Sequence, residues 1–340
     1  MTQRPLAPRT RETPPPPLHA GRARVLLRIL TIVSCLPYLS LKIAWIAGSH
    51  VGIPDDSTLL DHPTSMAVAN SATVLMDGTV IVLALLLTQA WGRRVRAWLL
   101  ALPMWVATGL LLPIMTGFPL QLLVGVISGR SPGSADSRAF LDGWVFGVVY
   151  SGFIIQGLAL GTLFALYARD RWGHLWQGAL RDLPPSPTGP ALRAAAVAAS
   201  VLAVVPATMH LVWAAGSTAG LNGTRIAERT PDFYALQALD ALFLAAAVAG
   251  VLLLAFRRTG GLALKVPLAL AWAGSGAAAC WGGWLSIASL GNVEEIADRP
   301  TAAMGLIYAV QMLVGMLIVT LGAYFLAERS AAAKPAGTRA

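Results

Sequence analysis

Eight long apolar stretches, separated by short polar connections, limit the folds that this chain can adopt. A helix of about 20 predominantly apolar residues crosses the hydrocarbon core of a bilayer, and each stretch approaches that length. Inside lipid the backbone must satisfy its own hydrogen bonds, which a helix does within one segment. The sequence therefore predicts an all-α fold, a polytopic bundle of eight transmembrane helices. The predicted spans are residues 25–47, 66–90, 97–115, 143–168, 191–215, 233–256, 264–287 and 302–327.

The composition agrees with a protein that lies mostly in lipid. Hydrophobic residues make up 56% of the chain and charged residues only 12%, whereas a soluble domain carries about 25% charged residues. We therefore expect the lipid bilayer to be a partner of the chain. The apolar piece at residues 120–127 is too short to span, and we predict that it is a re-entrant or interfacial segment.

The basic residues are distributed unevenly between the two predicted sides of the membrane. With the N-terminus inside, nineteen of the 25 Lys and Arg residues fall on the cytoplasmic side and five on the other. Cytoplasmic connections of membrane proteins carry an excess of Lys and Arg. We therefore predict a multi-pass protein of the plasma membrane with both termini cytoplasmic. This orientation accounts for the net charge of +9, so nucleic acid is not an expected partner.

The predicted spans and tails divide the chain into four parts. Residues 1–23 are basic and rich in Pro, and we predict a disordered cytoplasmic tail there. Residues 24–182 and residues 183–328 each hold four of the predicted spans. Residues 329–340 form a second, short cytoplasmic tail.

One short pattern occurs twice, at the ends of the first and fifth spans. Residues 42–52 read KIAWIAGSHVG and residues 210–220 read HLVWAAGSTAG, so a Lys or His is followed by x-x-W-x-A-G-S-x-x-G in both. Other residues recur in the same order at similar offsets: Trp105 with Trp272, Gly109 with Gly276, Asp77 with Asp240 and Tyr150 with Tyr308. We predict two tandem four-helix repeats related by a pseudo-twofold axis along the membrane normal, as in transporters built from parallel repeats.

The H-x-x-W-x-x-G ending of the fifth span, at His210, Trp213 and Gly216, resembles a small four-helix bacterial membrane family of unknown function. The whole chain is similar to uncharacterised multi-pass membrane proteins of high-GC actinobacteria, and it resembles a tandem fusion of that four-helix unit. Lys42 stands where the family pattern has His, so the first half departs from the pattern. The resemblance implies a helical membrane fold and brings no established activity with it.

Four ionisable residues lie inside the predicted spans and are the candidate ligand- or proton-binding residues. A charged side chain costs about 2.5–3.5 kcal/mol at mid-membrane, so its presence there indicates a functional site. At a rise of 1.5 Å per residue, Lys42 and Asp77 lie about 12 and 16 Å below the outer surface. His210 and Asp240 lie about 10 Å below it on the same scale. We predict a Lys42–Asp77 pair and a His210–Asp240 pair.

These pairs have three interpretations. They are buried ion pairs that hold helix against helix, or they line a polar cavity that exchanges protons or binds a ligand, or their side chains extend to the membrane surface. His210 is the most informative of the four, because histidine has an ordinary pKa of about 6.5 and can change charge near neutral pH.

Further residues inside the spans complete the candidate site. Trp45, Trp213, Trp105 and Trp272 occupy repeat-related positions and are candidates for the wall of a pocket. The alternative is that they only pack between helices. We also expect Gln156 and Gln311, which are polar and intramembrane, to hydrogen-bond across helices.

No metal or cofactor is predicted for this chain. The outer loops carry several carboxylates with His50 and His62 beside the first group. These residues form either a weak metal site or, as we expect, a solvated acidic rim. The spans contain no nucleotide-binding glycine loop, no H-E-x-x-H and no G-x-S-x-G motif.

The sequence thus predicts an integral membrane protein that binds or moves a small molecule or a proton through an outward-facing polar pocket between the two repeats. Two other classes stay open. One is a membrane-embedded enzyme that uses an Asp/His acid–base pair on a lipid-soluble substrate. The other is a non-catalytic accessory subunit. The sequence identifies neither the ligand nor the number of subunits.

Overall fold

The computed structural model describes residues 21–55, 57–129, 141–184, 186, 188–227, 229–257, 261–289 and 299–332. These residues form nine α-helices, and their only β pairing is an isolated bridge between Ala179 and Ala263. The helices are α1 (Arg22–Ile46), α2 (Pro63–Thr88), α3 (Ala97–Ile127), α4 (Gly143–Trp172), α5 (Gly189–Ala214), α6 (Gly223–Ala227), α7 (Pro231–Phe256), α8 (Lys265–Ala288) and α9 (Ala302–Ala332). The predicted all-α fold is confirmed. Most of the two predicted tails lies outside the described residues.

In the part of the chain that the structure describes, seven helices are long and apolar enough to cross a membrane, namely α1, α2, α3, α4, α5, α7 and α9. Helix α8 has 24 residues, many of them Gly, Ala and Ser, and is not among these seven. Helix α6 has five residues and belongs to the connection between α5 and α7. The chain therefore has the helix lengths and composition of a multi-pass membrane protein.

The separate segment predicted at residues 120–127 is wrong, because these residues are the last two turns of α3. The prediction ended this span at residue 115 and treated residues 120–127 as a separate piece too short to span, whereas α3 is continuous to Ile127. Helix α3 contains Pro103, Pro113 and Pro119 and continues through all three. Proline is tolerated inside transmembrane helices because neighbouring helices and local adjustments satisfy the freed backbone groups.

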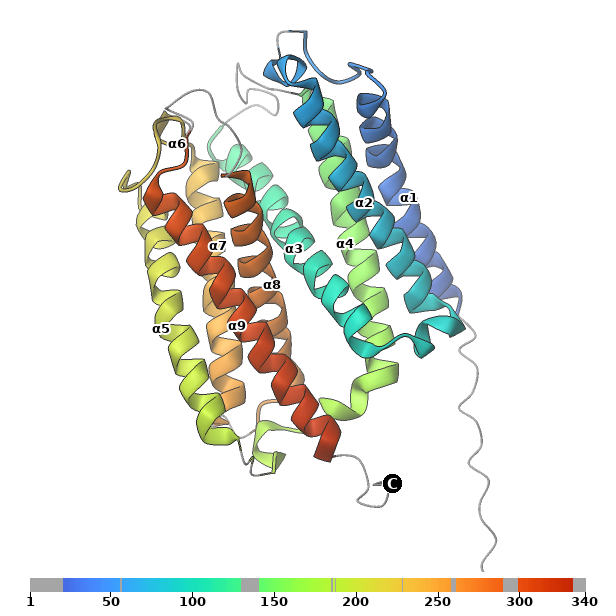
Figure 1. Ribbon diagram of the computed structural model, residues 1–340, viewed down its shortest axis with the longest axis vertical. Coiled ribbons are helices and arrows are strands. Elements are labelled where there is room, and N and C mark those ends of the chain that lie inside the picture. The colour runs from blue at the N-terminus through green and yellow to red at the C-terminus, as the bar shows by residue number, and fades with distance from the viewer. Residues whose placement is uncertain are drawn as a thin grey trace, which may run out of the picture.

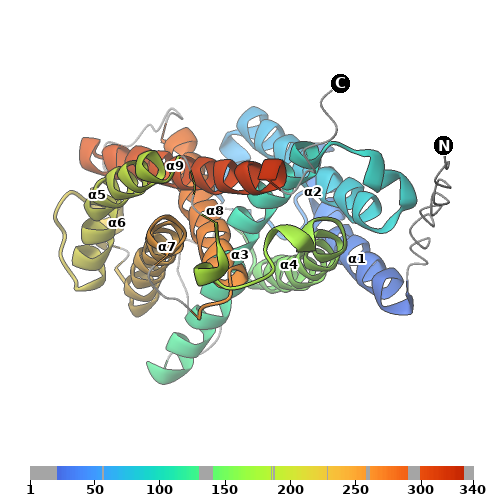
Figure 2. The ribbon, with the colours of Figure 1, turned by 90° about the horizontal axis from the view of Figure 1, so that it is seen from below.

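The long helices form two groups that α3 joins (Figures 1 and 2). Helices α1, α2 and α4 pack together around Leu83, Leu87 and Leu160, and helices α5, α7, α8 and α9 pack around a second core that includes Leu244 and Ile318. Successive long helices alternate in direction, so α1 begins and α9 ends at the lower end of Figure 1. Helix α3 contacts α4 on one side and both α7 and α8 on the other, with few contacts to α2.

Small residues allow the backbone of α8 to lie close to the backbones of three other helices. A Cβ atom at Gly274 would lie 2.5 Å from the backbone oxygen of Phe243 on α7, and one at Gly282 would lie 2.7 Å from that of Tyr308 on α9. Towards α3, a Cβ atom at Gly276 would lie 3.3 Å from the backbone oxygen of Trp105. Helix α8 therefore packs closely against α7, α9 and α3.

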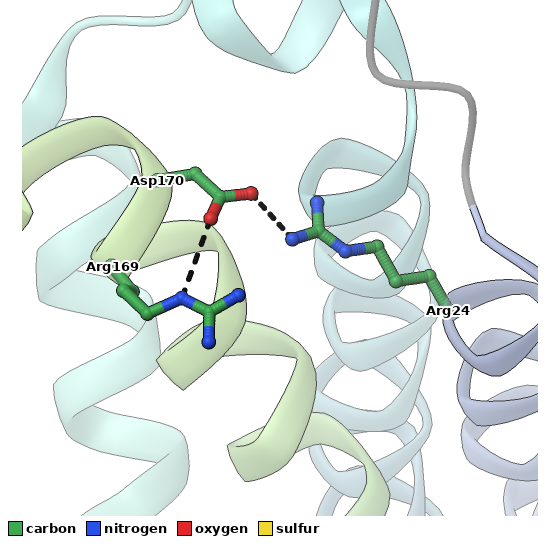
Figure 3. A network of polar contacts seen from close by, with 3 residues as sticks. All are labelled: Arg24, Arg169 and Asp170. Carbon is green, nitrogen blue, oxygen red and sulfur yellow. Dashed lines mark hydrogen bonds and ion pairs between the residues drawn. The ribbon is translucent and has the colours of Figure 1, made fainter.

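A charged contact joins the start of α1 to the end of α4 at the lower end of the bundle (Figure 3). The guanidinium of Arg24 donates a hydrogen bond to Asp170, and these side chains are 13% and 24% exposed. Arg169, which is 68% exposed, places its Nε 3.6 Å from the other oxygen of the same carboxylate. The contact ties the first and fourth helices of the chain together.

Candidate functional site

The two copies of the repeated pattern form the same turn. The indole of Trp45 donates a hydrogen bond to the backbone oxygen of Val51 (2.7 Å), and that of Trp213 donates one to the backbone oxygen of Ala219 (2.8 Å). In both turns the glycine after the second alanine is left-handed, with φ of +88° at Gly48. A residue other than glycine is strained in this conformation. The shared W-x-A-G-S spacing therefore specifies one helix-ending turn at two places.

Each turn also fixes the start of another helix. The backbone oxygen of Gly52 accepts a hydrogen bond from the backbone N–H of Asp142 (2.9 Å), just before α4. The backbone oxygen of Gly220 accepts one from the Thr301 hydroxyl, just before α9. The Lys42 and His210 side chains lie three residues before the Trp of each turn, on the same helix face.

Lys42 contacts polar and aromatic groups of the first half. Its Nζ donates a hydrogen bond to Asn70 Oδ1 on α2 at 2.7 Å. It also lies 4.8 Å from the ring centre of Tyr38 and 5.0 Å from that of Trp45, which are favourable cation–π distances. The predicted contact between Lys42 and Asp77 is not formed, although the two charges lie within electrostatic range.

Asp77 lies deeper in α2, and its residue is only 4% exposed. Its Oδ1 accepts a hydrogen bond from Gln156 Nε2 on α4 at 3.3 Å, while Oδ2 has no hydrogen-bond partner. A buried polar atom without a partner costs about 1–3 kcal/mol, and more when the group is charged. Asp77 thus has one carboxylate oxygen that makes no hydrogen bond.

His210 joins three helices of the second half and is 2% exposed. Its Nδ1 lies 2.7 Å from Gln237 Oε1 on α7, and its Nε2 lies 2.8 Å from Gln311 Oε1 on α9. Asp240 Oδ2 lies 3.9 Å from Nδ1, and the Asp240 side chain is 29% exposed. The structure therefore brings His210 and Asp240 together as predicted, at a distance longer than a direct hydrogen bond.

The four candidate tryptophans occupy two different environments. Trp45 and Trp213 adjoin the two polar clusters, and the Trp213 ring contacts His210 edge to face with ring centres 5.5 Å apart. Trp105 and Trp272 lie at the contact between α3 and α8. Only the first two therefore lie where a wall of the predicted site would be.

The four ionisable candidates belong to two clusters, one in each half. We define the first cluster as Lys42, Asn70, Asp77 and Gln156, and the second as His210, Gln237, Asp240 and Gln311. Within the described part of the chain, no hydrogen bond or ion pair joins one cluster to the other. Gln156 and Gln311 bond across helices as predicted.

Two cavities among the described residues lie elsewhere. A cavity of about 250 Å³ lies between α3 and α4 and is lined by apolar residues together with Thr108 and Thr162. A second, of about 360 Å³, lies between α1 and α4 beside Pro37 and Trp144. None of Lys42, Asp77, His210 and Asp240 lines either cavity.

Sequence reasoning did not include Asn70 and Gln237 in the site. Gln237 stands three residues before Asp240, and Asn70 stands seven before Asp77, so helical periodicity places each on the face of its aspartate. That signal was present in the sequence.

Among the described residues, no group of three or more His, Cys, Asp or Glu side chains lies close enough to hold a metal ion. Several carboxylates of the predicted acidic rim, including Asp56, Asp136 and Glu294, lie outside the described residues.

Comparisons with known proteins add no assignment to this geometry. No family model, no curated protein and no solved structure matches the chain.

Proposed function

We propose that the chain crosses the membrane eight times and consists of two tandem four-helix repeats. Helix α8 supplies the eighth span: its 24 residues extend about 36 Å at 1.5 Å per residue, which exceeds the bilayer core of about 30 Å. The repeats pair α1 with α5, α2 with α7, α3 with α8 and α4 with α9. The two equivalent turns at Trp45 and Trp213 support the first of these pairings.

The contact between α3 and α8 supports a pseudo-twofold axis between the repeats. Trp105 Nε1 donates to Ser275 Oγ at 3.1 Å, and Trp272 Nε1 donates to Thr108 Oγ1 at 3.3 Å. Gly109 and Gly276, the next residue after Thr108 and after Ser275, approach each other closely. A twofold interface requires that residue i contact residue j while j contacts i. Trp105 and Trp272 are counterparts, as are Thr108 and Ser275, so each tryptophan donates to the same repeat position of the other half.

For the orientation, we propose that the lower end of Figure 1 is cytoplasmic and that the membrane is the plasma membrane. Helix α1 begins and α9 ends there. The helix ends and connections on this side carry Arg93, Arg94, Arg96, Arg169, Arg171, Arg181, Arg257 and Lys265. The positive-inside rule supports the assignment.

For the function, we propose that the protein binds or moves a proton or a small molecule at its intramembrane polar clusters. The observation that carries this proposal is the second cluster. Ionisable residues inside membranes are costly and mark pathways and binding sites. His210 is buried with a partner at each ring nitrogen, and the carboxylate beside it is partly exposed. The second cluster thus places an imidazole beside a carboxylate inside the proposed membrane spans.

Proteoliposomes loaded with a pH-sensitive dye test this function. We expect an imposed pH gradient to collapse faster with the wild-type protein than in protein-free vesicles. His210→Asn is expected to return the rate to that of protein-free vesicles, and His174→Asn, at an exposed histidine far from the cluster, is expected to leave it unchanged. For a small-molecule site, impermeant thiol reagents should label His210→Cys or Asp240→Cys in a Cys35→Ser, Cys280→Ser background. Wild-type flux equal to that of empty vesicles, together with full protection of both cysteines, would overturn the proposal.

One observation favours a second candidate, a non-catalytic accessory subunit. In the second cluster both His210 nitrogens already have protein partners at hydrogen-bond distance, as expected of a structural tie between helices. Co-purification from native membranes in mild detergent tests this role. A stable heteromeric complex combined with complete cysteine protection would favour it over transport.

A further inference from the structure

The connection between α2 and α3 carries a concentrated positive charge at the lower end of the bundle (Figure 1). Its residues 90–96 read AWGRRVR, so three arginines fall within four positions. Arg94 and Arg96 are exposed and Arg93 is half-buried. None of the three makes a hydrogen bond or an ion pair with another residue of the described chain. We call these three residues the arginine patch.

The backbone that carries the arginine patch is held firmly. A Cβ atom at Gly92 would lie 1.8 Å from the backbone oxygen of Leu86, so the chain folds back tightly onto the end of α2. From α4, the Tyr167 hydroxyl donates a hydrogen bond to the backbone oxygen of Gly92 at 2.9 Å. The guanidinium of Arg171 donates one to the backbone oxygen of Val95 at 2.7 Å. Because this backbone is already ordered, less conformational freedom is lost when a partner binds to it.

The carboxylates at the same end of the molecule have other partners. Asp170 accepts a hydrogen bond from Arg24. Asp182 accepts one from a backbone N–H at 3.0 Å, and Glu328 accepts one from a serine hydroxyl at 2.6 Å. Within the described residues, no carboxylate therefore neutralises the arginine patch. Its charge is complementary to an anionic partner.

The connection between α7 and α8, which the proposed repeats place in the corresponding position, is covered by protein. Arg257 there donates a hydrogen bond to the backbone oxygen of Pro184 at 2.6 Å. The backbone of residues 178–180 pairs with that of residues 262–264 through hydrogen bonds of 3.0 and 3.1 Å. Among the described residues, no hydrogen bond joins the α2–α3 connection to another connection, and it lies at the edge of the bundle (Figure 2). The arginine patch is thus open to a partner where its counterpart is closed.

We propose that the arginine patch binds the phosphate headgroups of anionic phospholipids in the membrane leaflet beside it. Arginine recognises phosphate through paired N–H···O hydrogen bonds. Basic residues next to a membrane span are attracted to anionic lipid surfaces. The inference goes beyond the proposed binding of a proton or small molecule and depends on neither polar cluster.

The surroundings of the arginine patch favour a lipid over a soluble anion. Trp91 and Trp98 stand on either side of it and are 51% and 60% exposed. Tryptophan side chains of membrane proteins concentrate at the level of the lipid headgroups. The residue after Arg96 is the first of α3, a helix long and apolar enough to cross a membrane. The proposed orientation places the patch in the cytoplasmic leaflet, whose surface is anionic.

The test titrates the full chain, purified in a neutral detergent, with lipid and counts the bound lipids by native mass spectrometry. The probes are phosphatidylglycerol and phosphatidylcholine with the same acyl chains. We expect the wild-type protein to bind phosphatidylglycerol more tightly. Its affinity should fall by about fivefold for each arginine replaced by glutamine, so the triple variant Arg93→Gln, Arg94→Gln, Arg96→Gln should lose the preference. Replacement of all three by lysine keeps the charge and should retain most of it.

Arg181→Gln is the matched control for Arg94→Gln. Arg181 is exposed at the same end of the molecule, but its Nε lies 3.6 Å from a carboxylate oxygen of Asp182. The control should leave the preference for phosphatidylglycerol unchanged, whereas Arg94→Gln should lower it. Because the arginine patch makes no bond within the described protein, the melting temperature of the triple variant should equal that of the wild type.

Three results would overturn the inference. The first is equal binding of the two lipids by the wild-type protein. The second is a preference for phosphatidylglycerol that survives in the triple variant or falls equally in Arg181→Gln. The third is displacement of the bound lipid by glycerol phosphate at the same concentration, which would assign the arginine patch to a soluble phosphate compound. Retention of the lipid against excess glycerol phosphate would support the headgroup site.

Discussion

Trp105 on α3 and Trp272 on α8 each donate an indole hydrogen bond to a hydroxyl group on the other's helix. Near these bonds the two backbones lie close together, because a Cβ atom at Gly109 would lie 2.3 Å from the backbone oxygen of Gly276. In lipid, helices associate through close packing and interhelical hydrogen bonds, because the surrounding chains are as apolar as the helices themselves. This contact therefore holds the first half of the chain against the second.

Gly109→Ala should weaken that contact. The added methyl group meets backbone atoms of α8, which cannot move without displacing the helix, and overpacking of this kind costs about 1–3 kcal/mol. We expect a lower melting temperature in detergent, followed by tryptophan fluorescence. Gly157→Ala is the matched control: its methyl group meets the Met115 sulfur, a flexible side chain that can move aside. Equal destabilisation by both substitutions would contradict backbone contact between α3 and α8.

Asp77→Asn should leave the stability unchanged or raise it. The substitution removes a buried carboxylate whose Oδ2 has no partner, and replacing poorly compensated buried charge is often neutral or favourable. Gln156→Leu should have the opposite effect, because it removes the hydrogen bond to Oδ1 at a cost of about 1–3 kcal/mol. Thermal unfolding of both variants at one pH distinguishes them. A marked loss of stability in Asp77→Asn would indicate that the carboxylate has a partner after all.

Trp45→Phe and Trp213→Phe should destabilise the protein by similar amounts. Each removes one indole hydrogen bond to a backbone oxygen, at 2.7 Å in the first turn and 2.8 Å in the second. Such a bond contributes about 1 kcal/mol. The two melting temperatures, measured side by side, compare the turns directly. A loss confined to one variant would argue against equivalent turns.

Asp170→Asn should loosen the lower end of the first group of helices. Its partner Arg24 is 13% exposed, so the pair is partly shielded from water, and we expect a loss of about 1 kcal/mol or less. Arg169→Gln should have a smaller effect because Arg169 is 68% exposed. Added salt screens exposed charges, so the difference between wild type and Asp170→Asn should shrink as ionic strength rises. An effect that grows with salt would exclude an ion pair as its cause.

The sequence was sufficient for the all-α fold and for the repeated pattern at Trp45 and Trp213, and insufficient for the end of α3 and for the partners of the buried charges. Length and hydropathy identify a span because lipid imposes both. Depth along α2 placed Asp77 near Lys42, but Lys42 bonds to Asn70, two turns away on the same face. Periodicity gives the face of a helix and leaves open which turn of that face a long side chain contacts.

The contact between α3 and α8 was not predictable for a related reason. A helix that is apolar on every side has no hydrophobic face to orient it. Its packing depends on where small residues permit close approach, as at Gly109 and Gly276. The matching residues are visible in the sequence as repeats, but the reciprocal hydrogen bonds between them are seen only in the three-dimensional structure. The His210–Asp240 proximity was predictable because both residues lie at similar depth on neighbouring helices of one half.

The small residues of α8 also affect how the protein is made. A segment enters the bilayer from the insertion machinery largely according to its own hydrophobicity, and α8 is the long helix that is not among the seven apolar enough to span by composition. If it crosses the membrane as proposed, its stable residence there depends on α7, which emerges from the ribosome before it, and on α9, which emerges after it. Glycines that allow α8 to fit among its neighbours thus make its insertion a collective event, and a chain truncated before α9 is expected to be degraded.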